Sequence, residues 1–222
     1  MTATGEKQLN PLQIKDLVYE KLRQAIIDQT FEAGAPLREA ALTERFGVSK
    51  TPIREALVRL EQDGLVEIAP YRGARAKRYT RADLHEIYAA REILEAECVR
   101  RAASARDREL VESLRKNIAK TEKAIARGRL STAAEALDEF DEILFSQLHN
   151  SLLDDIRVRL SAHLQRLGQV GRSRERFQAS VEQHTLVVDA IADGDPVRAD
   201  SLLRAHLHNV LESQLPLLDD ER

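Results

Sequence analysis

Apolar residues return at helical spacing in three segments near the start of the chain. The first segment, Pro11–Gln29, places leucine and isoleucine on one face of a helix. A shorter helix is expected over Arg38–Phe46, where a glycine follows and ends it. The third begins at Ser49 or Thr51, both good N-cap residues, and continues to about Gln62.

Extended structure is expected only after the third helix. The runs Leu65–Ile68 and Ala74–Tyr79 flank a turn with one proline and one glycine, which predicts a β-hairpin. Thr80 and Asp83 then have the spacing of a capping box. From there the pattern is helical, and six helices are expected, over residues 81–104, 107–127, 131–149, 151–168, 173–193 and 196–215.

The change of pattern near residue 79 predicts a mainly α protein with two domains. Residues 1–79 combine three helices with a hairpin, as a winged helix-turn-helix does. Residues 80–222 form an all-helical antiparallel bundle. Its last helix starts after Gly194, with Asp195 as the N-cap and Pro196 at the first helical position.

Composition excludes several classes of protein. Hydrophobic residues make up 43% of the 222 residues and charged residues 32%, which is typical of a folded soluble chain. No apolar run approaches the roughly 18 residues of a membrane span, and the first residues lack the apolar core of a signal peptide. A cytoplasmic protein without membrane contact is therefore expected. Cys98 is the only cysteine, which excludes an internal disulfide and a cysteine-based zinc site.

Charge is divided unevenly between the two expected domains. Residues 1–80 carry 13 basic and 11 acidic side chains, a net charge of +2. Residues 81–222 carry 21 basic and 26 acidic side chains, a net charge of −5. The asymmetry indicates a small basic module attached to a larger acidic one.

Residues 39–64 have the pattern of two helices joined by a tight turn, and the second helix has one apolar stripe. Its inward-facing residues are Ile53, Ala56, Leu57 and Leu60. The N-terminal end of the helix then exposes Lys50, Thr51 and Arg54, and this part of a helix-turn-helix enters the major groove of DNA. Arginine and lysine donate hydrogen bonds to guanine or phosphate. On spacing alone, the alternative is a basic helix face that is merely solvated.

The hairpin would serve as the wing of this module. Arg72 and Gly73 fall at its tip, where glycine lets the backbone approach DNA and arginine can enter a minor groove. Ser49, at the start of the second helix of the motif, is also expected at the DNA.

Three stretches within residues 17–76 have a specific sequence: LVYEKLRQAIIDQTFEAGAPLRE, LTERFGVSKTPIREALVRLEQDGLVEI and YRGARA. They resemble the winged helix-turn-helix of the GntR family of bacterial transcription regulators. The resemblance implies contacts with double-stranded operator DNA by Arg38, Lys50, Thr51, Arg54 and Gly73. Lys50 stands where arginine is usual, which removes a bidentate donor. Gln29 and Thr30 stand where a glycine often follows the first helix.

Residues 81–215 resemble the FCD ligand-sensing domain of the FadR-type subfamily, through LHEIYAAREILEAECVRRAA and SVEQHTLVVDAIADGDPVRADSLLRAHL. The resemblance implies a homodimer that binds a small carboxylic acid, in many members beside a divalent metal. His184 and His206 match ligand positions of the subfamily. They lie on consecutive helices whose antiparallel packing could bring both imidazoles together.

The carboxylate ligand of such a site is open to two alignments. Without a gap, Leu137 falls at the position of the usual aspartate and Asp141 at that of a histidine; a slip of one residue puts Asp138 and Glu142 there instead. We favour Asp141 with His184 and His206, a two-histidine, one-carboxylate set that does not distinguish Zn, Ni, Fe and Mn. The alternatives are substitution by His149 or His163, or loss of the metal.

Arg91 matches an arginine of the subfamily's opening helix. It has two interpretations of equal weight: a bidentate clamp on an effector carboxylate, or a salt bridge to Glu95 one turn away. Cys98 lies among alanine and valine and is expected to pack rather than react.

These features together predict a dimeric DNA-binding regulator, a repressor whose operator affinity changes when an effector binds, and not an enzyme. One alternative is a metal-dependent enzyme with an accessory DNA-binding module, since two histidines and a carboxylate can activate water. Another is a DNA-binding dimer with a vestigial pocket.

Overall fold

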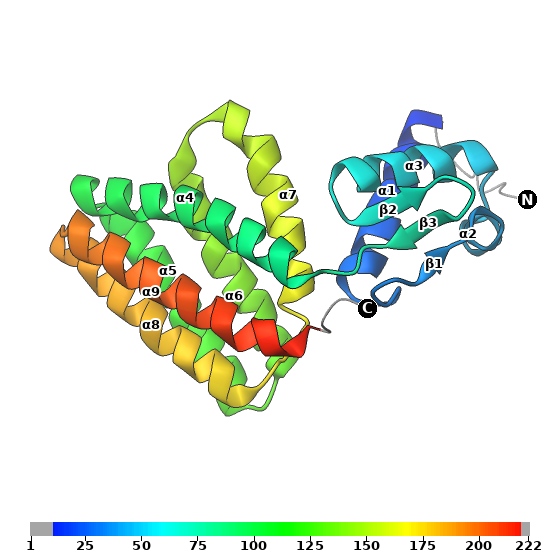
Figure 1. Ribbon diagram of the computed structural model, residues 1–222. Helices are drawn as coiled ribbons and strands as arrows, with labels where there is room; N and C mark the ends of the chain where they lie inside the picture. Colours follow the sequence, from blue (N-terminus) through cyan, green and yellow to red (C-terminus); the bar gives the residue numbers. More distant parts are fainter. Residues whose placement is uncertain (1–10, 219–222) are drawn as a thin grey trace, which may run out of the picture. The chain divides into compact units, whose positions relative to one another are not determined.

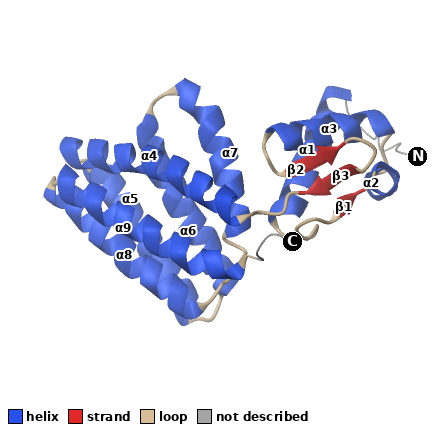
Figure 2. Cartoon of the chain, in the orientation of Figure 1, coloured by secondary structure: helices blue, strands red, loops and turns tan. Residues whose placement is uncertain are grey.

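Helices account for most of the described chain, residues 11–218 of the computed structural model, and strands occur only near its start (Figures 1 and 2). The chain divides between Arg78 and Tyr79 into two compact units.

The N-terminal unit is built around a buried contact between its first and third helices. The helices are α1 (Pro11–Ile27), α2 (Glu39–Phe46) and α3 (Lys50–Gln62). Leu22 and Ile26 of α1 and Ile53 and Leu60 of α3 are completely buried. Burying each of these side chains contributes about 1.5–3 kcal/mol, so the apolar stripe fixes which face of α3 remains outside.

A small antiparallel sheet completes this unit. Its strands are β1 (Pro36–Leu37), β2 (Val66–Ala69) and β3 (Gly73–Ala76), in the order β1-β3-β2. The hairpin β2–β3 was predicted. The two-residue β1, which pairs Leu37 with Ala74, was not, because two residues are too few to show a period of two.

The end of the first helix differs from the sequence prediction. The first helix ends at Ile27 rather than at Gln29, which has a left-handed backbone with φ of 57°. Glutamine here takes the conformation that glycine adopts most easily, at a cost of roughly 1–2 kcal/mol. Where glycine often follows the first helix in the family, this chain therefore has a glutamine in the backbone conformation that glycine favours.

The C-terminal unit contains the six expected helices within its described residues. They are α4 (Arg81–Ala105), α5 (Arg108–Ala126), α6 (Leu130–Phe145), α7 (Ser151–Leu167), α8 (Arg174–Asp193) and α9 (Pro196–Gln214), with 3₁₀ turns at Ser146–Leu148 and Leu215–Leu217. The third was expected to reach residue 149, but the 3₁₀ turn shortens it.

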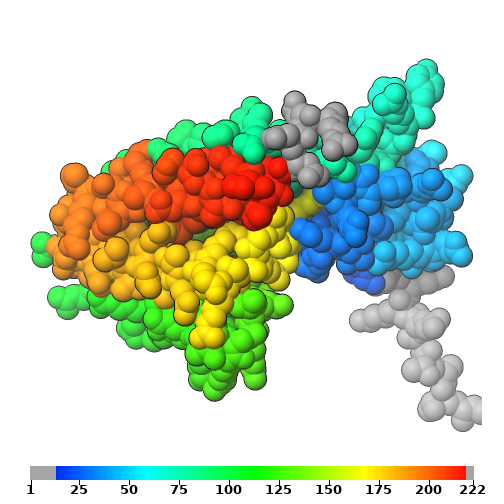
Figure 3. All heavy atoms as spheres, turned by 60° about the horizontal axis from the view of Figure 1, so that its bottom comes forward, coloured from blue at the N-terminus to red at the C-terminus, as the bar shows by residue number. Residues whose placement is uncertain are grey.

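Antiparallel neighbours form the bundle. The helix α9 lies between α4 and α8, and α5 packs against α6 and α8. Figure 3 shows α8 and α9, coloured yellow-orange to red, running side by side across one face of this unit. Side-chain caps mark the starts of several helices. Thr80 and Asp83 form the predicted capping box of α4. At the start of α9, Asp195 accepts a hydrogen bond from the backbone N–H of Arg198 at 2.9 Å, and Pro196 is the first helical residue.

Within residues 11–218, every helix is too short or too polar to cross a lipid bilayer.

Candidate functional site

The N-terminal end of α3 is a surface of exposed polar side chains. Because Ile53 and Ala56 turn inward, Ser49, Lys50 and Thr51 are left exposed at the start of the helix. Ser49 is the N-cap, but its side chain does not bond to the helix backbone. Its hydroxyl therefore remains free to bond outside the helix, where the N–H groups of the first turn attract anions.

Arg54 is the one residue of this surface held by an ion pair with a neighbouring helix. Its Nε donates to both carboxylate oxygens of Glu39 on α2, at 2.8 and 2.9 Å. The hydrogen bond from Arg54 lowers the pKa of Glu39. Because 64% of the Arg54 side chain is exposed, Glu39 orients the guanidinium without covering it.

The wing tip and the start of α2 are also exposed. Tyr71 and Gly73 both have left-handed backbones, with φ of 62° and 75°, and Arg72 between them faces solvent. A Cβ on Gly73 would meet nothing within 4 Å, so the requirement for glycine within this unit comes from backbone conformation. Arg38, the N-cap residue of α2, is exposed as well.

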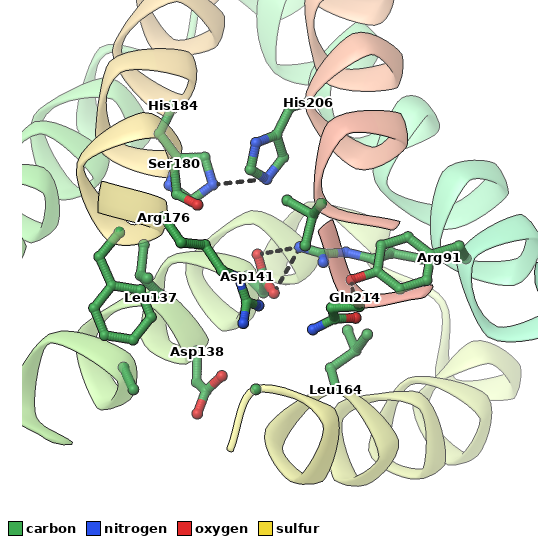
Figure 4. Close-up of a pocket in the computed structure, with 15 residues that line it drawn as sticks. Arg91, Leu137, Asp138, Asp141, Leu164, Arg176, Ser180, His184, His206 and Gln214 are labelled. Atoms are coloured by element: carbon green, nitrogen blue, oxygen red, sulfur yellow. Dashed lines mark hydrogen bonds and ion pairs between the residues drawn. The ribbon is translucent and has the colours of Figure 1, made fainter. Parts of the chain in front are cut away.

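The C-terminal unit encloses a partly open cavity of about 60 Å³ (Figure 4). A volume of this size holds on the order of two to four water molecules. Helices α4, α6, α7, α8 and α9 all contribute to its wall. The charged or histidine side chains that line it are Arg91, Asp138, Asp141, Arg176, His184 and His206.

Arg91 is buried between two carboxylates. Its Nη2 donates to both oxygens of Asp141 on α6, at 2.9 and 2.8 Å, and its Nε donates to Glu95 one turn along α4. Burial raises the pKa of Glu95 and of Asp141, and the Arg91 guanidinium opposes that rise. The salt bridge to Glu95, one of the two interpretations of Arg91, is thus present. Among the described residues, Nη1 of Arg91 has no hydrogen-bond partner.

The two histidines meet as their spacing predicts. The Nε2 atoms of His184 and His206 are 3.1 Å apart, and Nδ1 of His206 lies 2.7 Å from Oε1 of Gln183. His184 also stacks on Phe140, with ring centroids 3.8 Å apart. Burial, with the charge of Arg91, lowers the pKa of His184 to about 3, and burial also lowers that of His206. Both imidazoles are therefore neutral, with His206 donating to Gln183 and His184 donating to His206.

A resident divalent metal does not fit the donor set of this cavity. Two imidazole nitrogens 3.1 Å apart could share one ion at about 2.0–2.1 Å each, but among the described residues no carboxylate, Asp138 included, forms a three-ligand group with them. Leu137 offers only carbon, and both oxygens of Asp141 accept from Arg91. No group of three His, Cys, Asp or Glu side chains within the described chain could hold a metal.

The two substitute histidines lie elsewhere. His163 Nδ1 is 2.7 Å from the hydroxyl of Tyr79, and His149 follows a 3₁₀ turn with a left-handed backbone; neither lines the cavity. The structure therefore brings His184 and His206 together and pairs Asp141 with Arg91 instead.

The sequence pattern did not predict a functional role for Arg176 or Ser180 of the cavity wall, and it reached Asp138 only through the shifted alignment of the metal ligand (Figure 4). Asp138 is one of several acids along α6, and an acidic run usually marks a solvated face. Arg176 is likewise one of several arginines near the start of α8. Only the packing of these helices shows which side chains turn inward.

A winged helix-turn-helix joined to a helical bundle is the architecture of a two-domain DNA-binding protein. The sequence pattern of the bacterial regulatory proteins of the gntR family matches residues 14–75, and that of the FCD domain matches residues 86–209. The chain therefore belongs to the GntR family of transcription regulators with an FCD domain, as its sequence predicts.

Relatives of similar length are named as HTH-type transcription regulators. The HTH-type transcriptional repressor RspR of Escherichia coli K12 is 29% identical over 95% of this chain and 93% of its own. The HTH-type transcriptional regulator YdhC of Bacillus subtilis is 30% identical over 91% of each chain.

Solved structures support the fold. A GntR transcriptional regulator from Rhodococcus sp. RHA1 aligns with a TM-score of 0.77, at 22% identity over 92% of this chain and 99% of its own. McbR/YncC of E. coli aligns with a TM-score of 0.74, at 20% identity over 91% of this chain and 97% of its own.

The buried ion pairs of Arg91 generate a stability prediction. Arg91→Met keeps most of the volume but leaves Glu95 and Asp141 without their cation, so we expect a loss of about 3–5 kcal/mol in the free energy of unfolding. Urea denaturation measures it. The same substitution combined with Glu95→Gln and Asp141→Asn should cost much less, because no unpaired charge remains. Equal losses in the two variants would contradict this account.

The donor set generates a second prediction. Protein purified without a histidine tag should contain far less than one equivalent of Zn, Ni, Fe or Mn by elemental analysis. A chelator should leave its melting temperature unchanged, since no metal supports the native state. Stoichiometric metal that disappears in His184→Ala would show that the cavity does hold an ion.

Proposed function

We propose that the protein is a homodimeric repressor in the cytoplasm, that its N-terminal unit binds a pseudo-palindromic operator, and that a small carboxylic acid in the C-terminal cavity lowers operator affinity. The single observation that carries the DNA-binding half is the exposed N-terminal end of α3, with Arg54 oriented by Glu39. A helix packed through its other face offers this end to a major groove.

Each DNA contact has a role that follows from its position. Lys50, Thr51 and Arg54 would meet base edges and phosphates in the major groove. Ser49 and Arg38 would bond phosphates at the starts of α3 and α2, and this fixes the register of the protein on the duplex. Arg72 and Gly73 would bring the wing to the neighbouring minor groove.

Dimerisation gives the effector a way to act. A helix-turn-helix dimer reads two half-sites about one DNA turn, roughly 34–36 Å, apart. An effector that binds more tightly to a dimer with a different separation of the recognition helices lowers operator affinity. The size of the decrease is set by the ratio of the effector's affinities for the two forms of the dimer.

The effector half of the proposal is supported by two guanidinium groups in the cavity wall. Arg91 retains Nη1 after pairing with Glu95 and Asp141. Arg176 uses Nη1 to donate to the carbonyl oxygen of Val170 at 2.7 Å, which leaves Nε and Nη2 unpaired among the described residues. Guanidinium edges are well suited to a carboxylate.

A catalytic role is not proposed. The enzyme alternative requires a metal-bound water, and the cavity offers two imidazoles that bond to each other rather than a three-ligand set. The alternative of a vestigial pocket is disfavoured by the donor groups of Arg91 and Arg176 that remain available on the cavity wall.

The operator contact is tested with Arg54→Ala. We expect operator affinity in fluorescence anisotropy to fall by about 5- to 150-fold, because one guanidinium contact to a base contributes about 1–3 kcal/mol. Lys21→Ala, which removes an exposed cation from the middle of α1, is the control and should change affinity much less. Wild-type affinity in Arg54→Ala would place the recognition surface elsewhere.

The effector site is tested with a panel of small carboxylic acids. At least one should raise the melting temperature of the full-length protein and release the operator. Arg176→Met should lose both responses, because it removes the Nε and Nη2 donors that remain available to a carboxylate. Arg174→Met, which changes a neighbouring exposed arginine outside the cavity wall, should keep them. An acid that acts equally on both variants would exclude this cavity.

A further inference from the structure

The cavity contains a carboxylate for which the proposed function gives no purpose. Asp138 lies on α6 one turn before Asp141, is only partly exposed, and lines the cavity. Among the described residues its oxygens have no hydrogen bond and no ion pair. Asp141, on the same helix, accepts both of its hydrogen bonds from Arg91. Asp138 is thus the acid of this wall that is free to bind something else.

The cations near Asp138 are occupied or do not pair with it. Arg91 is held by Glu95 and Asp141, and Arg172 donates its Nε to the carbonyl oxygen of Gly168 at 3.2 Å. Figure 4 shows the Arg176 side chain extending from α8 into the cavity, with Asp138 on the facing wall. No ion pair joins the two, so a guanidinium group with Nε and Nη2 still available faces the same space as a carboxylate that has no partner among the described residues.

Charge balance decides which ligand suits that space. When all five groups are ionised, the guanidinium groups of Arg91 and Arg176 oppose the carboxylates of Glu95, Asp138 and Asp141 and leave a net charge of −1, and the raised pKa of each of these acids shows that their buried negative charge is already costly. A simple monocarboxylate would add a second uncompensated negative charge in a poorly solvated site, which is costly. A ligand with both an ammonium group and a carboxylate adds none.

We infer that the effector of this cavity is a small amino acid, whose carboxylate binds Arg176 and the free edge of Arg91 and whose ammonium group binds Asp138. The inference rests on the proposed function, because it specifies the chemical class of the same effector. The hydroxyl of Ser180, also in the cavity wall, supplies a further donor or acceptor. The volume of about 60 Å³ favours the smallest members of the class.

The state of Asp138 agrees with this assignment. Burial, and then the neighbouring charge of Asp141, raise the pKa of Asp138 to about 7. A carboxyl group with a raised pKa gains from an ammonium group placed next to it, because a nearby cation favours the ionised form.

The test compares matched ligands on the full-length protein. Glycine, alanine and serine carry both charges; acetate, propionate and 3-hydroxypropionate lack the amine, and ethylamine lacks the carboxylate. In isothermal titration with a chelator present, we expect at least one amino acid to bind about 10- to 100-fold more tightly than its matched acid, because a hydrogen-bonded charge contributes about 1.5–3 kcal/mol. Ethylamine should not bind measurably.

Asp138→Asn sharpens the comparison. It is isosteric and removes the negative charge, so we expect it to lose the preference for the amino acid and to bind the matched acid at least as well as wild type does. Glu135→Gln is the control, because it makes the same charge change at an exposed position one turn earlier on α6, and it should keep the wild-type preference.

The outcomes separate the inference from the proposed function. If the simple acids bind as tightly as the amino acids and release the operator, the inference is overturned and the proposed function stands. If Asp138→Asn keeps the preference, or no amino acid binds, the inference is likewise overturned. If the amino acids bind with the expected preference but leave operator affinity unchanged, the ligand assignment stands and effector control fails.

Discussion

The C-terminal unit depends on the burial of one arginine. A guanidinium group taken out of water must be matched by opposite charge and by hydrogen bonds, and Arg91 finds both in Glu95 and Asp141. The first pairing lies within α4, while the second ties α4 to α6 across the bundle. Because Asp141 is committed to Arg91, it is not available to the imidazoles beside it. One ion pair therefore decides both how two helices pack and which cavity groups remain to meet a ligand.

The sequence was sufficient where the determinants were local. Caps such as Thr80 with Asp83, and Asp195 before Pro196, mark helix starts because the side chain and the backbone it satisfies are three residues apart. The hairpin and the buried stripe of α3 follow equally from neighbouring residues. The strand β1 escaped prediction because its only support is a ladder to β3, almost forty residues later. The same holds for the left-handed Gln29, which no residue pattern requires.

The cavity was predictable only in part, for the same reason. The sequence alone indicated that the imidazoles of His184 and His206 could lie together, because a single tight turn joins α8 and α9. The partner of Asp141 lies fifty residues away on α4, and the pattern gave Arg91 an equally good local partner in Glu95. Asp138 was considered only as a shifted alignment of the metal ligand. Asp138 matters because it has no hydrogen-bond or ion-pair partner among the described residues, and only the packed structure shows this.

The helix α7 links the cavity to the start of the C-terminal unit. Leu164 and Gly168 line the cavity. The same stretch turns His163 and Arg166 toward Tyr79, the first residue of the unit: the Tyr79 hydroxyl lies 2.7 Å from His163 Nδ1, and the Arg166 guanidinium lies 5.3 Å from the Tyr79 ring. Close-packed interiors have low compressibility. The contacts of His163 and Arg166 therefore connect the cavity-lining end of α7 with Tyr79, which immediately follows the winged unit in the chain.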